Sequence, residues 1–210
     1  MMNKTVFVTG ISTEVGKTVI SAIVTESLQA DYWKPVQAGD LEYGDKDKVQ
    51  DMVSNTQSRF FDNTYTLNTP MSPHAAADID GIRIELEQLD RPATENTLVI
   101  EGAGGLLVPL NEQDTIADLI LPEDKVLLVS RHYLGSINHT LLSCEYLLQK
   151  GIQPGLLFSG DQHPTTESII LQKTGLPILG RVEEEKTFSK EVVAHYAETF
   201  RPALTDWLNS

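Results

Sequence analysis

The segment that decides the fold is Thr5–Thr18, which has the sequence TVFVTGISTEVGKT. Its first half is a short apolar, β-branched run, and its second half holds two glycines followed by Lys17 and Thr18. Backbone N–H groups and the dipole at a helix N-terminus favour phosphate oxygens, while a lysine and a threonine placed there suit outer phosphates and magnesium. We therefore expect a strand, a phosphate-binding loop and a helix in direct succession.

The spacing of the glycines departs from the usual phosphate loop. Five residues separate Gly10 from Gly16, where the usual pattern has four, and Ile11 stands where the first glycine belongs. A glycine-capped turn followed by a solvated lysine is the plain structural alternative. The position between an apolar run and a helical pattern favours nucleotide phosphate binding, although the loop by itself specifies no reaction.

Strand-like runs alternate with helix-like stretches along the rest of the chain. Continuous apolar runs suit strands covered on both faces, and segments with helical apolar spacing separate them. This alternation predicts an α/β fold, doubly wound around a mostly parallel sheet, in one domain over residues 1–210. The expected strands are Thr5–Thr9, Tyr32–Val36, Thr97–Ile100, Lys125–Ser130, Gly155–Ser159 and Pro177–Val182. The expected helices are Lys17–Leu28, Asn138–Lys150, Thr165–Thr174 and Val192–Trp207, with a loop and a short helix within Asp40–Asn63.

Composition narrows the class of protein. The chain has 210 residues, of which 40% are hydrophobic and 22% charged, as in ordinary globular proteins. No apolar run approaches a membrane span and no secretory signal is visible, so we expect neither. The net charge of −14 argues against a nucleic-acid partner. The single cysteine, Cys144, favours a reducing, cytoplasmic location.

The segment Leu98–Gly105, with the sequence LVIEGAGG, is a second candidate site. An apolar run ends at Glu101, and glycines follow it. Ligands gather at the carboxyl ends of strands in doubly wound folds, where a carboxylate holds magnesium directly or through water. The alternative is a carboxylate that caps the next turn, but the cost of leaving a charge at the end of a buried strand favours the metal.

Lys34 is a third candidate, because a lysine inside the run Tyr32–Val36 is unusual unless its charge has a partner. Facing the phosphate loop, it would neutralise charge that develops during phosphoryl transfer. An edge-strand lysine that extends to solvent beside Pro35 is an equally good interpretation from local sequence. Asp45 and Asp47 follow in an acidic stretch that, taken alone, indicates only a solvated loop.

Two further segments have the pattern of helix starts. Ser72 and Pro73 suit the N-cap and the first helical position, and we interpret His74 beside them as a structural hydrogen-bonding residue. Leu134–His139, with the sequence LGSINH, follows an apolar run. Local sequence is as consistent with an anion site of N–H groups there as with a plain helix start.

Together these segments resemble dethiobiotin synthetase. The resemblance rests on five segments in the same order, which are Gly10–Thr18, Lys34–Gly39, Ser72–His74, Glu101–Gly105 and Leu134–His139. It implies a three-layer α/β/α fold of the P-loop NTP hydrolase type. It also implies a homodimeric ATP-dependent ligase that joins CO₂ to 7,8-diaminononanoate as a carbamate and closes a cyclic urea with ATP and magnesium.

The resemblance also implies roles for individual residues. It makes Lys17, Lys34 and Thr13 catalytic, and it makes Thr18, Glu101 and Asp45 the metal ligands, with Asp47 as the open alternative to Asp45. ATP is expected at Thr13, Glu14, Val15, Gly16, Lys17, Thr18, Glu101 and Gly104. The diamine is expected at Lys34 and Ala38, with Gly135, Ser136 and Asn138 of the neighbouring subunit receiving its carboxylate.

Three positions depart from the family's pattern. Ala38 replaces a serine that faces the substrate in some members, Ser159 replaces an asparagine that contacts adenine, and Gly180–Glu183 replaces a segment that often ends in proline near the base. The base preference therefore stays open, and a synthetase acting on another diamine is one alternative. A regulatory ATPase switch of the MinD/ParA type is another, although such proteins usually carry a lysine early in the loop, where this chain has Thr13 and Glu14.

Overall fold

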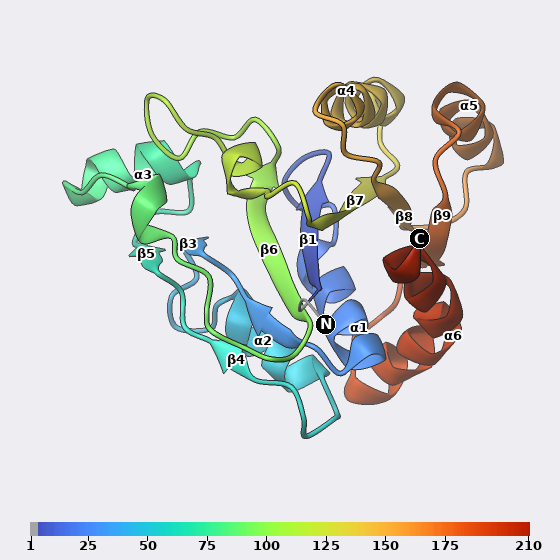
Figure 1. Cartoon of the computed structure of the whole chain (residues 1–210), viewed down its shortest axis with the longest axis horizontal. Coiled ribbons are helices and arrows are strands. Elements are labelled where there is room, and N and C mark those ends of the chain that lie inside the picture. The colour runs from blue at the N-terminus through green and yellow to red at the C-terminus, as the bar shows by residue number, and fades with distance from the viewer. Residues whose placement is uncertain (1–3) are drawn as a thin grey trace.

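The computed structural model describes residues 4–210. Its centre is a seven-stranded sheet with the order β4-β2-β6-β1-β7-β8-β9, and all of its strand pairs are parallel (Figure 1). The strands of this sheet are β1 (Thr5–Gly10), β2 (Asp31–Trp33), β4 (Phe60–Phe61), β6 (Leu98–Gly105), β7 (Lys125–Arg131), β8 (Gly155–Ser159) and β9 (Ile178–Val182). A separate parallel pair joins β3 (Val36–Ala38) to β5 (Tyr65–Leu67). The predicted α/β class with a mostly parallel sheet is confirmed.

Helices cover the sheet on two sides. Figure 1 shows α4 and α5 along one side and α1, α2 and α6 along the other, and α1 packs against both α2 and α6. The helices are α1 (Lys17–Leu28), α2 (Asp45–Met52), α3 (Pro73–Asp80), α4 (Ser136–Gln149), α5 (Pro164–Thr174) and α6 (Lys190–Asn209), with short 3₁₀ turns η1 (Leu86–Gln88) and η2 (Ile116–Leu119). Of the helices within residues 4–210, none combines the length and the apolarity needed to cross a membrane.

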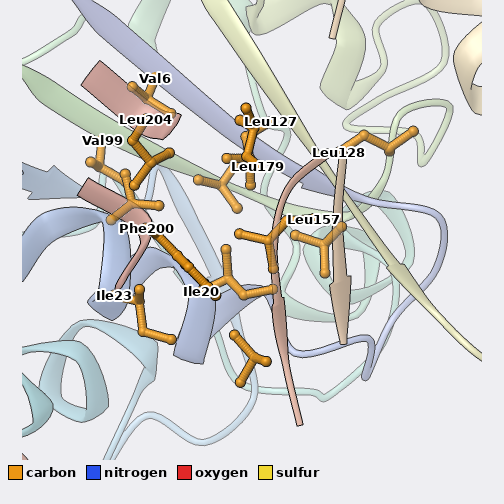
Figure 2. Packing of buried hydrophobic residues seen from close by; sticks show 14 of the residues in the cluster. Val6, Ile20, Ile23, Val99, Leu127, Leu128, Leu157, Leu179, Phe200 and Leu204 are labelled. Atoms are coloured by element: carbon orange, nitrogen blue, oxygen red, sulfur yellow. The ribbon is translucent and has the colours of Figure 1, made fainter. Parts of the chain in front are cut away.

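The central strand β1 explains why the apolar runs are continuous. Val6 and Val8 point into the cluster formed with α1 and α6, whereas Phe7 points into a second cluster that includes Trp33 and Ile100. Figure 2 shows the first cluster, in which side chains of α1 and α6 meet those of the sheet. Because successive side chains of a strand point to opposite faces, a strand with helices on both sides buries every one of them.

Two strands differ from the expectation. The expected strand Tyr32–Val36 is interrupted, because β2 ends at Trp33 and β3 begins at Val36 in the other sheet. Pro35 offers no N–H to a ladder, so the sheet stops there. The expected strand Thr97–Ile100 instead continues through Glu101 to Gly105, with a register shift against β1 between Val8 and Gly10.

The helices agree more closely with the sequence. The bounds of α1 are those expected, and the short helix expected within Asp40–Asn63 is α2. Ser72 is the N-cap of α3 with Pro73 in its first turn, as predicted, although the Ser72 side chain makes no capping hydrogen bond. Helix α4 begins at Ser136 rather than Asn138, and it ends at Gln149.

Candidate active site

The phosphate loop connects β1 to α1 in a tight conformation. Gly16 has a φ of +90°, and a Cβ added there would lie 2.8 Å from the Ser159 hydroxyl oxygen, so both the backbone and the space require glycine. The Lys17 ammonium folds back over the loop and donates to the Ser12 carbonyl oxygen at 3.0 Å. This hydrogen bond joins the two ends of the loop and holds the Lys17 ammonium against the loop backbone.

Lys34 follows β2 and lies in the interior, with 4% of its surface exposed. Its ammonium lies 2.7 Å from Asp45 Oδ2 and 3.1 Å from Glu101 Oε1. Strand β2 lies between β4 and β6 and is therefore not an edge strand. This placement contradicts the interpretation of Lys34 as an edge-strand lysine that extends to solvent.

Glu101 receives hydrogen bonds on both carboxylate oxygens. Oε1 accepts from the Thr18 hydroxyl at 3.0 Å and from the Lys34 ammonium at 3.1 Å, and Oε2 accepts from the Tyr32 hydroxyl at 2.9 Å. The residue is 1% exposed and lies within β6, opposite Val8 of β1. A buried carboxylate is costly unless it is paired, and here three donors stabilise it, one from α1 and two from β2 and the residue that follows it.

The pKa values of the two lysines are shifted in opposite directions. Burial lowers the pKa of Lys17 to about 8, with the Lys34 charge adding to this effect and the Glu101 charge opposing it. Burial also acts to lower the pKa of Lys34, but the charges of Glu101 and Asp45 outweigh it and raise the pKa above its ordinary value. Lys34 is therefore held as a cation, whereas the lowered pKa of Lys17 makes it the more easily deprotonated of the two.

The structure separates Asp45 from Asp47. Asp45 lies at the start of α2, and although burial opposes ionisation, the charges of Lys34 and Lys48 lower its pKa. Asp47 turns back instead and accepts from the Gly44 backbone N–H at 2.9 Å, which caps its own helix. Asp45 is the aspartate that joins the buried charges.

A cavity of about 780 Å³ runs past these groups. We call the part beside the loop the phosphate end, and its charged and hydroxyl groups are those of Lys17, Thr18, Lys34, Asp45 and Glu101. Arg131, Ser159, Glu183 and Glu184 line another part, which we call the base end after the nucleotide base expected there. There Arg131 forms an ion pair with Glu184.

The remaining predicted residues fall into two groups. Thr13, Glu14, Gly16, Ala38 and Gly104 line the cavity. The side chain of Val15 packs in the hydrophobic core instead. Gly135, Ser136 and Asn138 are not among the described residues that line this cavity.

Sequence reasoning missed three participants. Tyr32 bonds Glu101, Gln37 accepts from the Asp45 backbone N–H at 3.2 Å, and Arg131 pairs with Glu184. Tyr32 lies in an apolar run, where a tyrosine is typical of the hydrophobic core. The only signal in the sequence was that a buried tyrosine hydroxyl needs a hydrogen-bond partner. The other two depend on tertiary contacts that no local pattern specifies.

The donors at the phosphate end suit a magnesium ion shared with phosphates. They are two carboxylates and one hydroxyl, all hard oxygen ligands, gathered around the Thr18–Glu101 hydrogen bond. Within residues 4–210, no cluster of three or more His, Cys, Asp or Glu side chains suited to a metal ion is present. A set this small fits a Mg²⁺ that keeps waters and takes phosphate oxygens better than it fits an all-protein metal cage.

Comparison with known proteins gives relatives across nearly the whole chain. The family model described as an AAA domain matches residues 4–192. A protein of Christiangramia forsetii named ATP-dependent dethiobiotin synthetase BioD is 61% identical over 206 residues, covering 98% of this chain and 100% of that one. A protein of the same name from Cytophaga hutchinsonii is 48% identical over 197 residues, covering 92% of this chain and 95% of that one.

Solved structures extend the comparison to the fold. A ParA family ATPase from Chlorobium tepidum has a TM-score of 0.54 at 13% identity, covering 99% of this chain and 95% of that one. The MinC:MinD cell division protein complex of Aquifex aeolicus gives a TM-score of 0.56 at 12% identity, covering 97% of this chain and 96% of that one. At such identities the likeness concerns the fold alone, which is that of these P-loop ATPases.

Proposed function

The chain belongs to the dethiobiotin synthetase family of ATP-dependent ligases, and from this premise we propose that it closes 7,8-diaminononanoate and CO₂ into the cyclic urea dethiobiotin with ATP and magnesium. We also propose that residues 1–210 act as one domain in the cytoplasm, with small molecules and no nucleic acid or membrane as partners. The observation that supports the activity most is the pair of buried lysines beside two carboxylates and a phosphate loop.

The reaction needs alignment and charge neutralisation more than a protein nucleophile. An amine of the substrate adds to CO₂ and gives a carbamate, whose oxygen attacks the γ-phosphorus of ATP while ADP leaves. The second amine then attacks the carbamate carbon, and inorganic phosphate leaves with closure of the ring. Negative charge accumulates on the γ-phosphoryl group and the carbamate, which is where fixed cations lower the barrier.

The two lysines suit this accumulation of charge. Lys17 lies over the loop, where its ammonium meets the outer phosphates and the carbamate. The ammonium of Lys34 lies near enough for its charge to act on Lys17, and Asp45 and Glu101 hold it protonated. Thr13 completes the catalytic set from within the loop, and Glu14, Val15, Gly16 and Gly104 complete the nucleotide site.

Thr18, Asp45 and Glu101 are the residues we propose as magnesium ligands. Bound there, the ion would supply positive charge that neutralises the phosphates of ATP. The protein's own contribution is to place the two carboxylates beside Lys34 and to fix Glu101 by three hydrogen bonds. Asp45 is preferred to Asp47, because Asp47 is engaged in capping α2.

A homodimer would explain how Gly135, Ser136 and Asn138 reach the substrate although they do not line the cavity of their own subunit. A second hollow of about 480 Å³ lies between the phosphate loop and α4, and Leu106, Leu142 and Tyr146 are among its lining residues. Leu107 and Leu142 are exposed beside it. We propose that a second copy covers this apolar hollow and brings the start of its own α4 to the substrate, where Gly135, Ser136 and Asn138 receive the carboxylate.

Mixing two inactive variants tests this arrangement. Lys17→Ala damages the site of its own subunit, whereas Asn138→Ala damages the site of the neighbour. Hybrid dimers then contain one intact site, and random mixing restores about a quarter of the normal activity. If the mixture stays as inactive as either variant alone, the substrate carboxylate is not received across the interface.

The activity itself is tested by following labelled carbon. The enzyme is incubated with ATP, magnesium, ¹³C-bicarbonate and the diamine, and the product is analysed by mass spectrometry. We expect one ¹³C in a cyclic urea of dethiobiotin mass. ATP hydrolysis that is stimulated by a protein partner and ignores the diamine would favour the MinD/ParA-type switch, and a product obtained only from another diamine would favour the drifted synthetase.

A further inference from the structure

Tyr32 is the one donor to Glu101 that does not line the cavity, among the residues that the structure describes. Its side chain is fully buried in the hydrophobic core, and its ring lies 6.4 Å from that of Phe60 in the neighbouring strand. The hydroxyl donates to Glu101 Oε2 at 2.9 Å. The bond therefore comes from a side chain that packing holds in place.

This bond divides the two oxygens of Glu101 between different tasks. Oε1 faces Thr18 and Lys34, both of which line the cavity. Oε2 is engaged by Tyr32 on the side of the core. With Tyr32 in place, only Oε1 is directed toward the cavity, and turning the carboxylate would leave a buried hydroxyl without its partner.

We propose that Tyr32 is a positioning residue that confines Glu101 to binding the metal through Oε1 alone, and that it thereby selects Mg²⁺ over Ca²⁺. This inference rests on the proposed magnesium site. Mg²⁺ requires nearly ideal octahedral geometry with single, short oxygen contacts, whereas Ca²⁺ takes more ligands and readily binds both oxygens of one carboxylate. A carboxylate with one oxygen engaged elsewhere suits the smaller ion.

The alternative is that the Tyr32 hydroxyl only satisfies a buried polar group. In that case, removal of the hydroxyl would change the stability of the fold and would weaken both ions alike. Selection between ions would remain the same. The ratio of the two ion affinities therefore separates a positioning role from a structural one.

The test compares the unaltered enzyme with Tyr32→Phe, which removes the hydroxyl and keeps the ring. Calorimetry measures the dissociation constant between the enzyme and a non-hydrolysable ATP analogue, once with Mg²⁺ and once with Ca²⁺ as the bound ion. We expect the Ca²⁺-to-Mg²⁺ ratio of dissociation constants to fall by about tenfold in Tyr32→Phe. Tyr196→Phe is the matched control, because the Tyr196 hydroxyl donates to another glutamate, Glu185, at 2.9 Å and has no contact with the proposed metal ligands, so its ratio is expected to stay unchanged.

Glu101→Gln separates this inference from the proposed magnesium site. If Glu101→Gln weakens the Mg²⁺ complex while Tyr32→Phe leaves the ratio unchanged, the role of Tyr32 is overturned and the metal site stands. If Glu101→Gln leaves both complexes unchanged, Glu101 is no ligand and both proposals fall.

A second measurement does not depend on how well Tyr32→Phe folds. Infrared difference spectra of the unaltered enzyme, labelled with ¹³C-glutamate, report whether a carboxylate binds a metal through one oxygen or two. The band of Glu101 is the one that Glu101→Gln removes. We expect a one-oxygen signature with Ca²⁺ as well as with Mg²⁺, and a two-oxygen signature with Ca²⁺ would contradict the proposal.

Discussion

The two ends of the cavity differ in how their residues are held. At the phosphate end, Lys17, Lys34 and Glu101 are all buried and each contacts another member of the site or the loop itself. At the base end, Glu183 and Glu184 are exposed, and the Arg131–Glu184 pair lies at the surface. Buried charges must be matched, so any change among them is costly, whereas exposed charges are screened and tolerate replacement.

This difference in burial explains why the phosphate end resembles the dethiobiotin synthetases while the base end departs from them. The loop, the lysine and the strand carboxylate depend on one another, so their types and order are tightly constrained. Ser159, by contrast, contributes a single hydroxyl near Gly16. We infer that the phosphate end carries the chemistry and that the base end adjusts nucleotide affinity.

The largest effect is expected at the phosphate end, from Lys17→Ala. Removing a cation that faces the transferred phosphoryl group should lower turnover by about 10²–10³-fold. The measurement is kcat with saturating ATP and diamine, with thermal unfolding as the control for folding. Turnover close to that of the unaltered enzyme would remove Lys17 from the catalytic set.

A matched pair of substitutions tests which aspartate belongs to the buried charges. Asp45→Asn removes one partner of Lys34 and one proposed metal ligand, so we expect the magnesium concentration at half-maximal rate to rise about tenfold. Asp47→Asn removes the same charge from the cap of α2 and should cost less than about 1 kcal/mol of stability, without changing the magnesium requirement. Equal effects of the two substitutions would contradict the assignment of Asp45.

The pH dependence of nucleotide affinity tests the electrostatics of Lys17. Burial lowers the pKa of Lys17 to about 8 in the free enzyme, and we expect the triphosphate to bind the protonated form. The dissociation constant of a non-hydrolysable analogue should therefore be level up to about pH 8 and then rise, approaching tenfold per pH unit. In Lys17→Met the affinity should be weaker and the rise absent, and a rise that persists in this variant would assign it to another group.

The smallest effect is expected at the base end. Ser159→Ala removes one hydroxyl, whose hydrogen bond is worth about 1 kcal/mol, so KM for ATP should change by less than about fivefold, with kcat unaffected. Steady-state kinetics with ATP, CTP and GTP measure this. A large loss of kcat from Ser159→Ala would mean that the two ends do not divide chemistry from affinity.

The same contrast describes how much of the molecule the sequence predicted. The alternation of apolar runs and helical patterns predicted the parallel sheet and the bounds of α1, because these depend on local periodicity. It did not predict β4 or the β3–β5 pair, since strands of two or three residues leave almost no pattern. The interruption at Pro35 had a local signal, but its consequence, a second sheet, depends on pairing with a distant segment.

In the site, local sequence reached only part of the arrangement. The loop identified Lys17 and Thr18, but it left Lys34 undecided between an active-site cation and a surface lysine. The structure rules out the surface lysine, because two carboxylates from separate segments pair with Lys34 at 2.7 Å and 3.1 Å. Tyr32 was missed because a tyrosine in an apolar run is typical of core, and its hydroxyl became informative only with Glu101 opposite it.

The central claim is that the buried charges couple ATP cleavage to a diamine and CO₂. The most direct test is phosphate release from ATP in the presence of magnesium, bicarbonate and 7,8-diaminononanoate, with each component omitted in turn. We expect release to require all of them, so that leaving out either the diamine or bicarbonate reduces it to background. Equal release without the diamine would rule out this coupling, because the phosphate end would then cleave ATP without the substrate that its two lysines are proposed to align.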